Sequence, residues 1–168
     1  MPLFLKRYVL LVEATSRRVG EAAMYLVFVL MAILLYSAFS KAFLLPALWT
    51  LEMAQFTMVA YYILGGPYSM QRGEHVRMDL LYSTWSPRTK AMIDVVTVLF
   101  LLFYLGVLLY GGINSTTYAL VVSERSYSAW APYMAPIKIL MCLGVVLMIL
   151  QTTAVMLRDI ASVRGIEF

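Results

Sequence analysis

Uncharged apolar runs long enough to cross a lipid bilayer constrain this chain more than any other feature. Residues 22–36 and 95–110 are apolar on every side of a helix. A bilayer-spanning helix needs about 20 mostly apolar residues, whereas the strands of a membrane barrel alternate over segments of about 10. With 62% hydrophobic and 13% charged residues, the composition also lies outside that of soluble domains. The chain is therefore predicted to be an all-α integral membrane protein.

The apolar runs predict a single membrane domain with four transmembrane helices, over residues 19–45, 48–66, 88–120 and 135–157. Pro46 ends the first of these runs. A Gly-Gly-Pro sequence at residues 65–67 is a helix-end signal and closes the second. Ser86-Pro87 starts the third, with serine as N-cap and proline in the first turn. Residues 72–87 then form a polar connection on one side of the membrane.

The segment before the first run, residues 2–18, combines about ten apolar residues with four basic ones, which are Lys6, Arg7, Arg17 and Arg18. About ten apolar residues are too few to span a bilayer. We expect an N-terminal amphipathic helix that lies in the interface with its basic residues on anionic headgroups. A flexible basic tail is the alternative.

The basic residues are distributed unevenly between the two sides of the membrane. Four spans place both termini on the same side as residues 72–87. That side holds ten of the thirteen lysines and arginines, and the other side holds only Lys41, Arg125 and Lys138. The positive-inside rule therefore predicts cytoplasmic termini. The basic residues form no patch interleaved with aromatic residues, so nucleic acid is not an expected partner.

The residues that catalysis or metal binding would need are scarce. His75 is the only histidine and Cys142 the only cysteine, which leaves no paired spacing for zinc or an iron–sulfur cluster, and no glycine loop cradles phosphate. We expect neither an enzyme nor a bound cofactor or metal. Asp79 follows His75 by four residues, and we expect this histidine to be a hydrogen-bonded structural group.

The second predicted span is the most polar. Its residues Glu52, Gln55 and Tyr62 have the spacing of one helical face. An ionisable group that faces lipid costs at least a few kcal/mol, so this face should meet protein or headgroups. Two interpretations stay open at this point. The face is an interface with another membrane protein, or Glu52 is the carboxylate of a self-sufficient, proton-coupled exporter.

The sequence GEHVRMDLLYSTWSPRTK at residues 73–90 resembles the small membrane subunit of TRAP (tripartite ATP-independent periplasmic) transporters, the DctQ-like family. The matching positions are Gly73, His75, Val76, Arg77, Asp79, Leu80, Leu81, Ser86, Pro87 and Arg88. Trp49 and Glu52 are similar to the family's Trp-x-x-Glu, and the segment from Pro136 to Gln151 is similar to its final span. The resemblance covers roughly residues 20–160. Met78 and Met53 depart from the pattern, the second at a position where the family often has another acid.

This resemblance implies an accessory, multi-pass subunit of the bacterial inner membrane, bound to a large multi-span permease subunit. The permease is expected to carry the substrate and sodium, and a periplasmic binding protein delivers organic anions, commonly carboxylates. The residues expected at the interface with the permease or with membrane lipids are Trp49, Glu52, Gln55, Tyr62, His75, Arg77, Asp79, Arg88 and Lys138. Candidates for contact with the binding protein are Glu124, Arg125 and Trp130.

Overall fold

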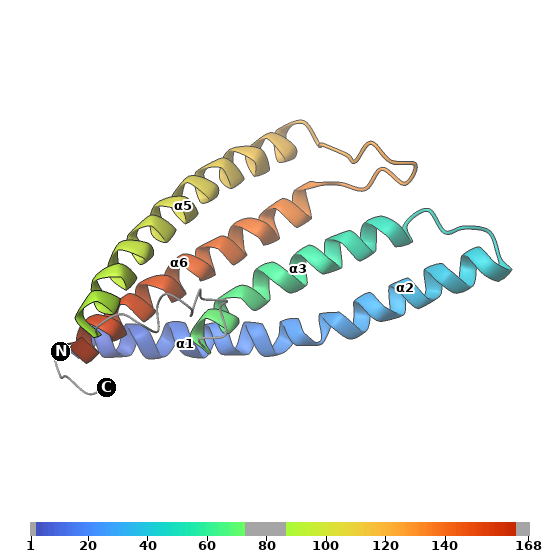
Figure 1. Cartoon of the computed structure of the whole chain (residues 1–168). Coiled ribbons are helices and arrows are strands. Elements are labelled where there is room, and N and C mark those ends of the chain that lie inside the picture. The colour runs from blue at the N-terminus through green and yellow to red at the C-terminus, as the bar shows by residue number, and fades with distance from the viewer. Residues whose placement is uncertain (1–2, 73–86, 164–168) are drawn as a thin grey trace.

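The computed structural model describes residues 3–72 and 87–163, and the regular elements in this part of the chain are helices. They are α1 (Leu3–Met24), α2 (Leu26–Phe43), α3 (Thr50–Gln71), α5 (Pro87–Val121) and α6 (Ala135–Val163) (Figure 1). Within the described residues, three segments are long and apolar enough to cross a membrane, namely Phe4–Phe43, Val96–Val121 and Ala135–Arg158. The all-helical membrane fold is thus confirmed, while the count of four spans stays a prediction because α3 is not among the three.

The N-terminal helix is longer than the sequence suggested. The helix predicted over residues 2–18 continues to Met24, and α2 begins after a one-residue break at Tyr25. The Arg17 guanidinium bonds the Glu21 carboxylate at 2.9 Å across the expected boundary, and such i, i+4 pairs support a helix. Buried positions recur every three or four residues along α1, at Val9, Val12, Ser16, Gly20 and Ala23. The exposed basic residues Lys6, Arg7, Arg17 and Arg18 complete an amphipathic helix.

Helix α3 does not end at the Gly-Gly-Pro sequence, so that prediction is wrong. It continues through Pro67 to Gln71. A proline inside a helix removes the amide hydrogen that would bond the carbonyl four residues earlier, here that of Ile63. Gly144 of α6 packs against this place, since a Cβ on Gly144 would lie 3.3 Å from the Ile63 carbonyl oxygen. The backbone of α6 therefore covers the carbonyl that Pro67 leaves without its helical partner.

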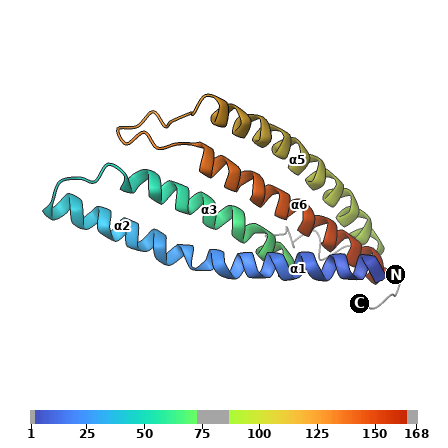
Figure 2. The same cartoon turned by 180° about the vertical axis from the view of Figure 1, so that it is seen from behind.

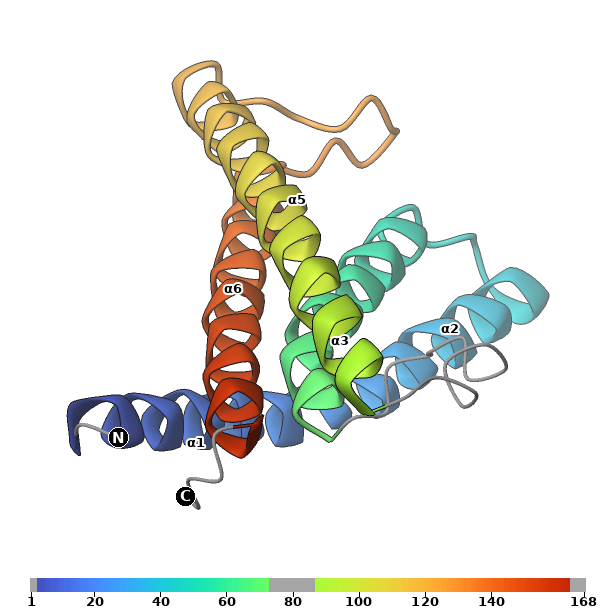
Figure 3. The same ribbon diagram turned by 60° about the vertical axis from the view of Figure 1, so that its left-hand side comes forward.

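The helices are arranged as one layer and do not close into a bundle. In the layer α2 packs on α3, α3 on α6 and α6 on α5, while the outer helices α2 and α5 form no substantial contact (Figures 1 and 2). Helix α1 crosses one end of this layer and packs on α3 and α6. Figure 3 shows that the two pairs, α2 with α3 and α5 with α6, diverge from this end toward the connecting loops.

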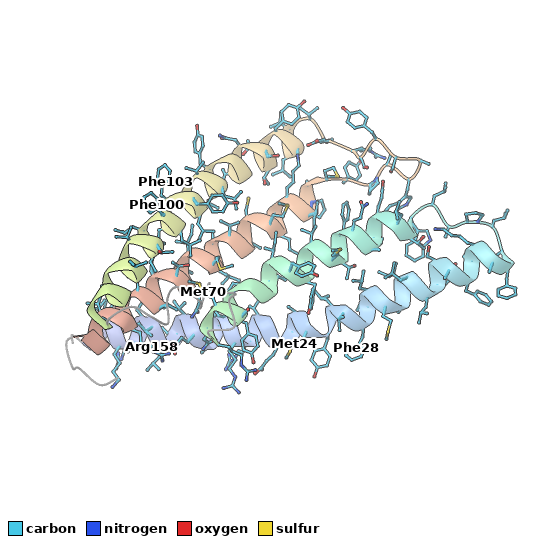
Figure 4. The ribbon with its side chains drawn as sticks, viewed as in Figure 1. Met24, Phe28, Met70, Phe100, Phe103 and Arg158 are labelled. Carbon is cyan, nitrogen blue, oxygen red and sulfur yellow. The ribbon has the colours of Figure 1, made fainter. Side chains whose placement is uncertain are left out.

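A small cluster of buried apolar side chains joins α1 to α6. Val9 and Val12 pack with Ala154, and Tyr8, Leu150 and Leu157 surround them. Most other large apolar side chains are exposed on the outside of the layer. In Figure 4 Phe28 of α2 and Phe100 and Phe103 of α5 point away from the neighbouring helices; they are 61%, 71% and 74% exposed. Lipid or another protein must cover these surfaces.

Candidate functional site

Glu52 lies in the first turn of α3, at the end of the layer where the loops are. Its side chain is buried, with 7% of the residue exposed. The Ser126 hydroxyl, in the loop between α5 and α6, donates a hydrogen bond to Glu52 Oε1 at 3.1 Å. This contact joins residues 74 positions apart in the chain. Glu52 therefore anchors the α5–α6 loop to the start of α3.

The predicted polar face of α3 is divided by the structure. Gln55 and Tyr62 are exposed, while Glu52 is turned toward Ser126. Glu52 and Tyr62 are ten residues apart, which at 3.6 residues per turn separates their directions by about 80° around the axis of α3. This rotation is enough for the two side chains to face different surroundings. The exposed stripe of α3 comprises Leu51, Gln55, Met58 and Tyr62.

The loop between α5 and α6 is held by its own contacts. The Ser126 amide donates to the Pro132 carbonyl at 3.0 Å, and the Met134 amide donates to the Glu124 carbonyl at 3.0 Å. The Arg125 guanidinium lies over the Tyr133 ring, 4.2 Å from its centroid. Residues 124–134 thus form a hairpin-like lobe at the end of the layer.

The side chains proposed to contact a binding protein lie in different parts of this lobe. Glu124 forms an ion pair with Lys138 in the first turn of α6, and Arg125 donates to the Tyr133 hydroxyl. Trp130 is 40% exposed, and Tyr127 at the tip is fully exposed. Sequence reasoning missed Tyr127, although an aromatic residue between two serines in a polar loop is a usable signal. Tyr127 and Trp130 are accessible aromatic residues of the lobe, as is Tyr133, which is 51% exposed.

Trp49 packs within the turn that connects α2 and α3. Its ring stacks on Tyr36, with centroids 5.6 Å apart. The next residue, Thr50, donates a hydrogen bond from its hydroxyl to Ser37 Oγ at 3.1 Å. The tryptophan therefore contributes first to packing within the chain, although 37% of the residue is still exposed.

At the opposite end, polar contacts fasten α1 to the layer. The hydroxyls of Tyr8 and Thr153 lie 2.8 Å apart. Arg158 forms an ion pair with Glu13 at 3.0 Å, and only 12% of the Glu13 side chain is exposed. Tyr8 and Glu13 flank the buried Val9 and Val12, so the amphipathic pattern of α1 was the signal that could have identified them.

Four predicted site residues cannot be placed in these clusters. His75, Arg77 and Asp79 lie outside the described residues, and so does the side chain of Arg88, whose backbone belongs to the first turn of α5. Within residues 3–72 and 87–163, no three His, Cys, Asp or Glu side chains lie close enough to hold a metal ion.

The long apolar helices, the polar contacts between helices at each end of the layer and the wide exposed apolar surfaces are those of a helical integral membrane protein. A sequence model of the DctQ component of tripartite ATP-independent periplasmic transporters matches residues 30–162. The match includes most of α2, all of α3 and α5, and all but the last residue of α6. The chain belongs to this family, and it is the small membrane component of a TRAP transporter. No curated protein and no solved structure matched the chain.

Membership has three direct consequences. The DctQ family is a family of transporter components and not of enzymes. A tripartite system implies association with a large permease and with a periplasmic binding protein. The membrane-spanning helices and the family together indicate an inner-membrane protein.

Proposed function

We propose that this chain is an accessory subunit that scaffolds the large permease during uptake of organic anions, carboxylates in particular, delivered by the binding protein. Substrate and sodium bind to the permease in this proposal, and the small subunit holds neither. The observation that carries it is the single layer of helices with no substantial contact between α2 and α5. A layer of this kind encloses no path for a solute, but it widens the footprint of a protein to which it binds.

The topology that fits this role has four spans and cytoplasmic termini. Helix α3 has 22 residues, or about 33 Å at 1.5 Å per residue, which matches a hydrocarbon core of about 30 Å. It lies between α2 and α6, which both belong to candidate spans. The end of the layer that carries α1 has the exposed residues Lys6, Arg7, Arg17, Arg18 and Arg72. This excess of positive charge supports the cytoplasmic assignment of that end.

The exposed stripe of α3 is the surface that we assign to the permease. Gln55 lies five residues after the start of α3, about 8 Å along the helix, and its exposed side chain carries an amide. In hydrocarbon such a group lacks hydrogen-bond partners, whereas Asn and Gln side chains commonly bond across helix interfaces in membranes. Leu51, Met58 and Tyr62 extend the same surface. On the other side of the membrane from α1, Tyr127 and Trp130 are the surface that we assign to the binding protein.

The alternative function, an exporter driven by Glu52, has less support. Glu52 lies in the first turn of α3 and bonds the α5–α6 loop, a position suited to anchoring the loop. A proton-coupled carboxylate would need access from both sides of the membrane, and 7% exposure offers little.

Reconstitution tests the accessory role. Vesicles with the small subunit alone should take up no solute with the binding protein and a sodium gradient, and vesicles with both membrane subunits should take up a carboxylate. Deletion of the small subunit should abolish transport while the permease is still inserted. Uptake or efflux by the isolated chain would contradict the proposal.

Cysteine cross-linking tests the assigned face. In a Cys142→Ser background, Gln55→Cys and Met58→Cys should cross-link to the permease, while Met31→Cys serves as the control because it is similarly exposed but lies on α2. Equal cross-linking at Met31 and Gln55 would show that the assignment of the face is wrong.

A further inference from the structure

A groove runs between the C-terminal end of α1 and the C-terminal half of α3. Its volume is about 440 Å³, and the lining residues are Gly20, Ala23, Met24, Tyr61, Tyr62, Gly65, Gly66, Tyr68, Ser69 and Arg72. The groove shares only Tyr62 with the surface assigned to the permease. It lies at the end of the layer where α1 crosses.

One glycine on each helix shapes this space. Gly20 brings α1 against α3, because a Cβ on Gly20 would lie 2.3 Å from Tyr68 Cβ. Beyond this contact α1 ends at Met24, and α2 continues after the break at Tyr25. Gly65 carries no side chain to occupy the space beside α3, since nothing lies within 4 Å of a Cβ placed there. The two helices therefore approach most closely at Gly20 and Tyr68 and leave an open groove beside Gly65.

The lining changes from apolar to cationic along the groove. Ala23 and Met24 of α1 (Met24 is labelled in Figure 4) and the Tyr61 and Tyr62 rings of α3 line one end. The other end carries Arg72, whose guanidinium donates to the Tyr68 hydroxyl at 3.1 Å and lies 5.6 Å from the centre of the Tyr68 ring. A ligand that matches this lining has an apolar tail and an anionic head.

The dimensions of the groove decide between a lipid tail and a helix of another protein. From Tyr61 to Arg72 the wall of α3 is about 16 Å long at 1.5 Å per residue. All the empty space of the groove, about 940 Å³ with the solvent at its mouth included, gives a mean cross-section of about 60 Å² over that length. A helix 10–12 Å in diameter has a cross-section of roughly 80–110 Å², so it does not enter the groove. An extended acyl chain is narrow enough to do so.

We propose that this groove binds an anionic phospholipid. One acyl chain lies along Gly65 between Met24 and Tyr62, and the phosphodiester lies at Arg72. The surroundings favour a negative headgroup, because Arg18 is exposed on α1 near this end, beside the Arg17–Glu21 ion pair, and basic residues at a membrane surface attract anionic lipids. A lipid in this position fills the space between α1 and α3 and fastens the amphipathic helix to the layer. The site requires only this chain and a bilayer, so it does not depend on the scaffolding role.

Native mass spectrometry of the full chain in mild detergent tests the site. The probes are dioleoylphosphatidylglycerol and, as the neutral comparison, dioleoylphosphatidylcholine. Gly65→Leu places a side chain in the groove, and Gly106→Leu on α5 is its matched control, because nothing lies within 4 Å of a Cβ at either glycine. Arg72→Gln removes the charge at the head of the groove. Circular dichroism checks that each variant keeps its helical content.

The expected results separate the tail site from the head site. Gly65→Leu should lower the apparent affinity for both lipids at least about fivefold, a change of about 1 kcal/mol, and Gly106→Leu should leave it unchanged. Arg72→Gln should remove the preference for phosphatidylglycerol while phosphatidylcholine still binds. Unchanged lipid binding in Gly65→Leu, or an equal loss in Gly106→Leu, would overturn the proposal. So would a Gly65→Leu variant that keeps its lipid but no longer co-purifies with the permease, because the groove would then belong to the subunit interface.

Discussion

The contact between Gly144 and Ile63 offers the sharpest test of how α3 and α6 pack. A methyl group on Gly144 would lie 1.9 Å from Ile63 Cγ2 and 3.3 Å from both the Cβ and the carbonyl oxygen of Ile63. Carbon atoms in contact normally keep 3.5–4.0 Å. A β-branched side chain in a helix has essentially one rotamer at χ1, so Ile63 cannot turn away. Gly144→Ala should therefore push the two helices apart.

The expected free-energy change combines two opposing effects. Overpacking of this kind costs about 1–3 kcal/mol, while alanine in place of glycine stabilises a helix by about 0.8–1.0 kcal/mol. Gly106→Ala gives the second effect alone, because nothing lies within 4 Å of its Cβ. Gly144→Ala should thus be less stable than Gly106→Ala by about 1–3 kcal/mol. The measurement is unfolding in mixed micelles, followed by circular dichroism as the denaturing detergent increases.

A double-mutant cycle shows whether the clash is the cause. With Ile63→Ala present, the methyl group of Gly144→Ala has room, so the loss should shrink and a coupling energy of about 0.5–3 kcal/mol should appear. Equal stabilities of Gly144→Ala and Gly106→Ala, or additive effects with Ile63→Ala, would refute the close packing of α3 and α6 described above.

Three further predictions concern α1, the loop and the isolated chain. The double substitution Val9→Ser and Val12→Ser should release α1 from the layer, because burial of each valine contributes up to about 1.5–3 kcal/mol. The control pair Leu10→Ser and Leu11→Ser, on exposed positions of the same helix, should leave α1 in place. The rate of proteolysis within α1 is the measurement. Glu52→Ala should speed amide exchange in the loop between α5 and α6, and Glu52→Gln should preserve protection because an amide oxygen still accepts the hydrogen bond; equal exchange in both variants would contradict the anchoring role. The purified subunit alone should not change the internal pH of vesicles when lipophilic cations are added, as an exporter that uses Glu52 would.

The helices themselves were predictable from the sequence, because apolar length is a local property. The helices α2, α5 and α6 contain long apolar runs, and no soluble or β-barrel fold accommodates them. The end of α2 before Pro46 also follows from local backbone preferences. Family membership followed from a contiguous motif at residues 73–90, where no tertiary information was needed.

The features that failed or were missed depend on contacts between distant residues. A Gly-Gly-Pro sequence is a helix-end signal, but α3 continues through Pro67 where it packs closely against Gly144 of α6. The orientation of Glu52 depends on Ser126, a residue in another connection. Helical periodicity indicated that Glu52 and Tyr62 share a broad face, yet 80° of rotation decides which neighbour each one meets. The order of helices in the layer is likewise set by such contacts and not by sequence distance.

The layer also explains why the amphipathic helix matters to a subunit of this kind. Within the layer each long helix packs on its immediate neighbours, and the outer helices α2 and α5 form no substantial contact with each other. Helix α1 crosses the end of the layer and contacts α3 and α6 together, through Gly20 at Tyr68 and through the cluster of Val9, Val12 and Ala154. Lipid offers no hydrophobic driving force between helices, so a rigid layer in a membrane needs close packing, polar contacts and a helix such as α1 that crosses it. The Tyr8–Thr153 hydrogen bond and the Glu13–Arg158 ion pair belong to the contact between α1 and α6, so α1 is held at this end of the layer by polar as well as apolar contacts.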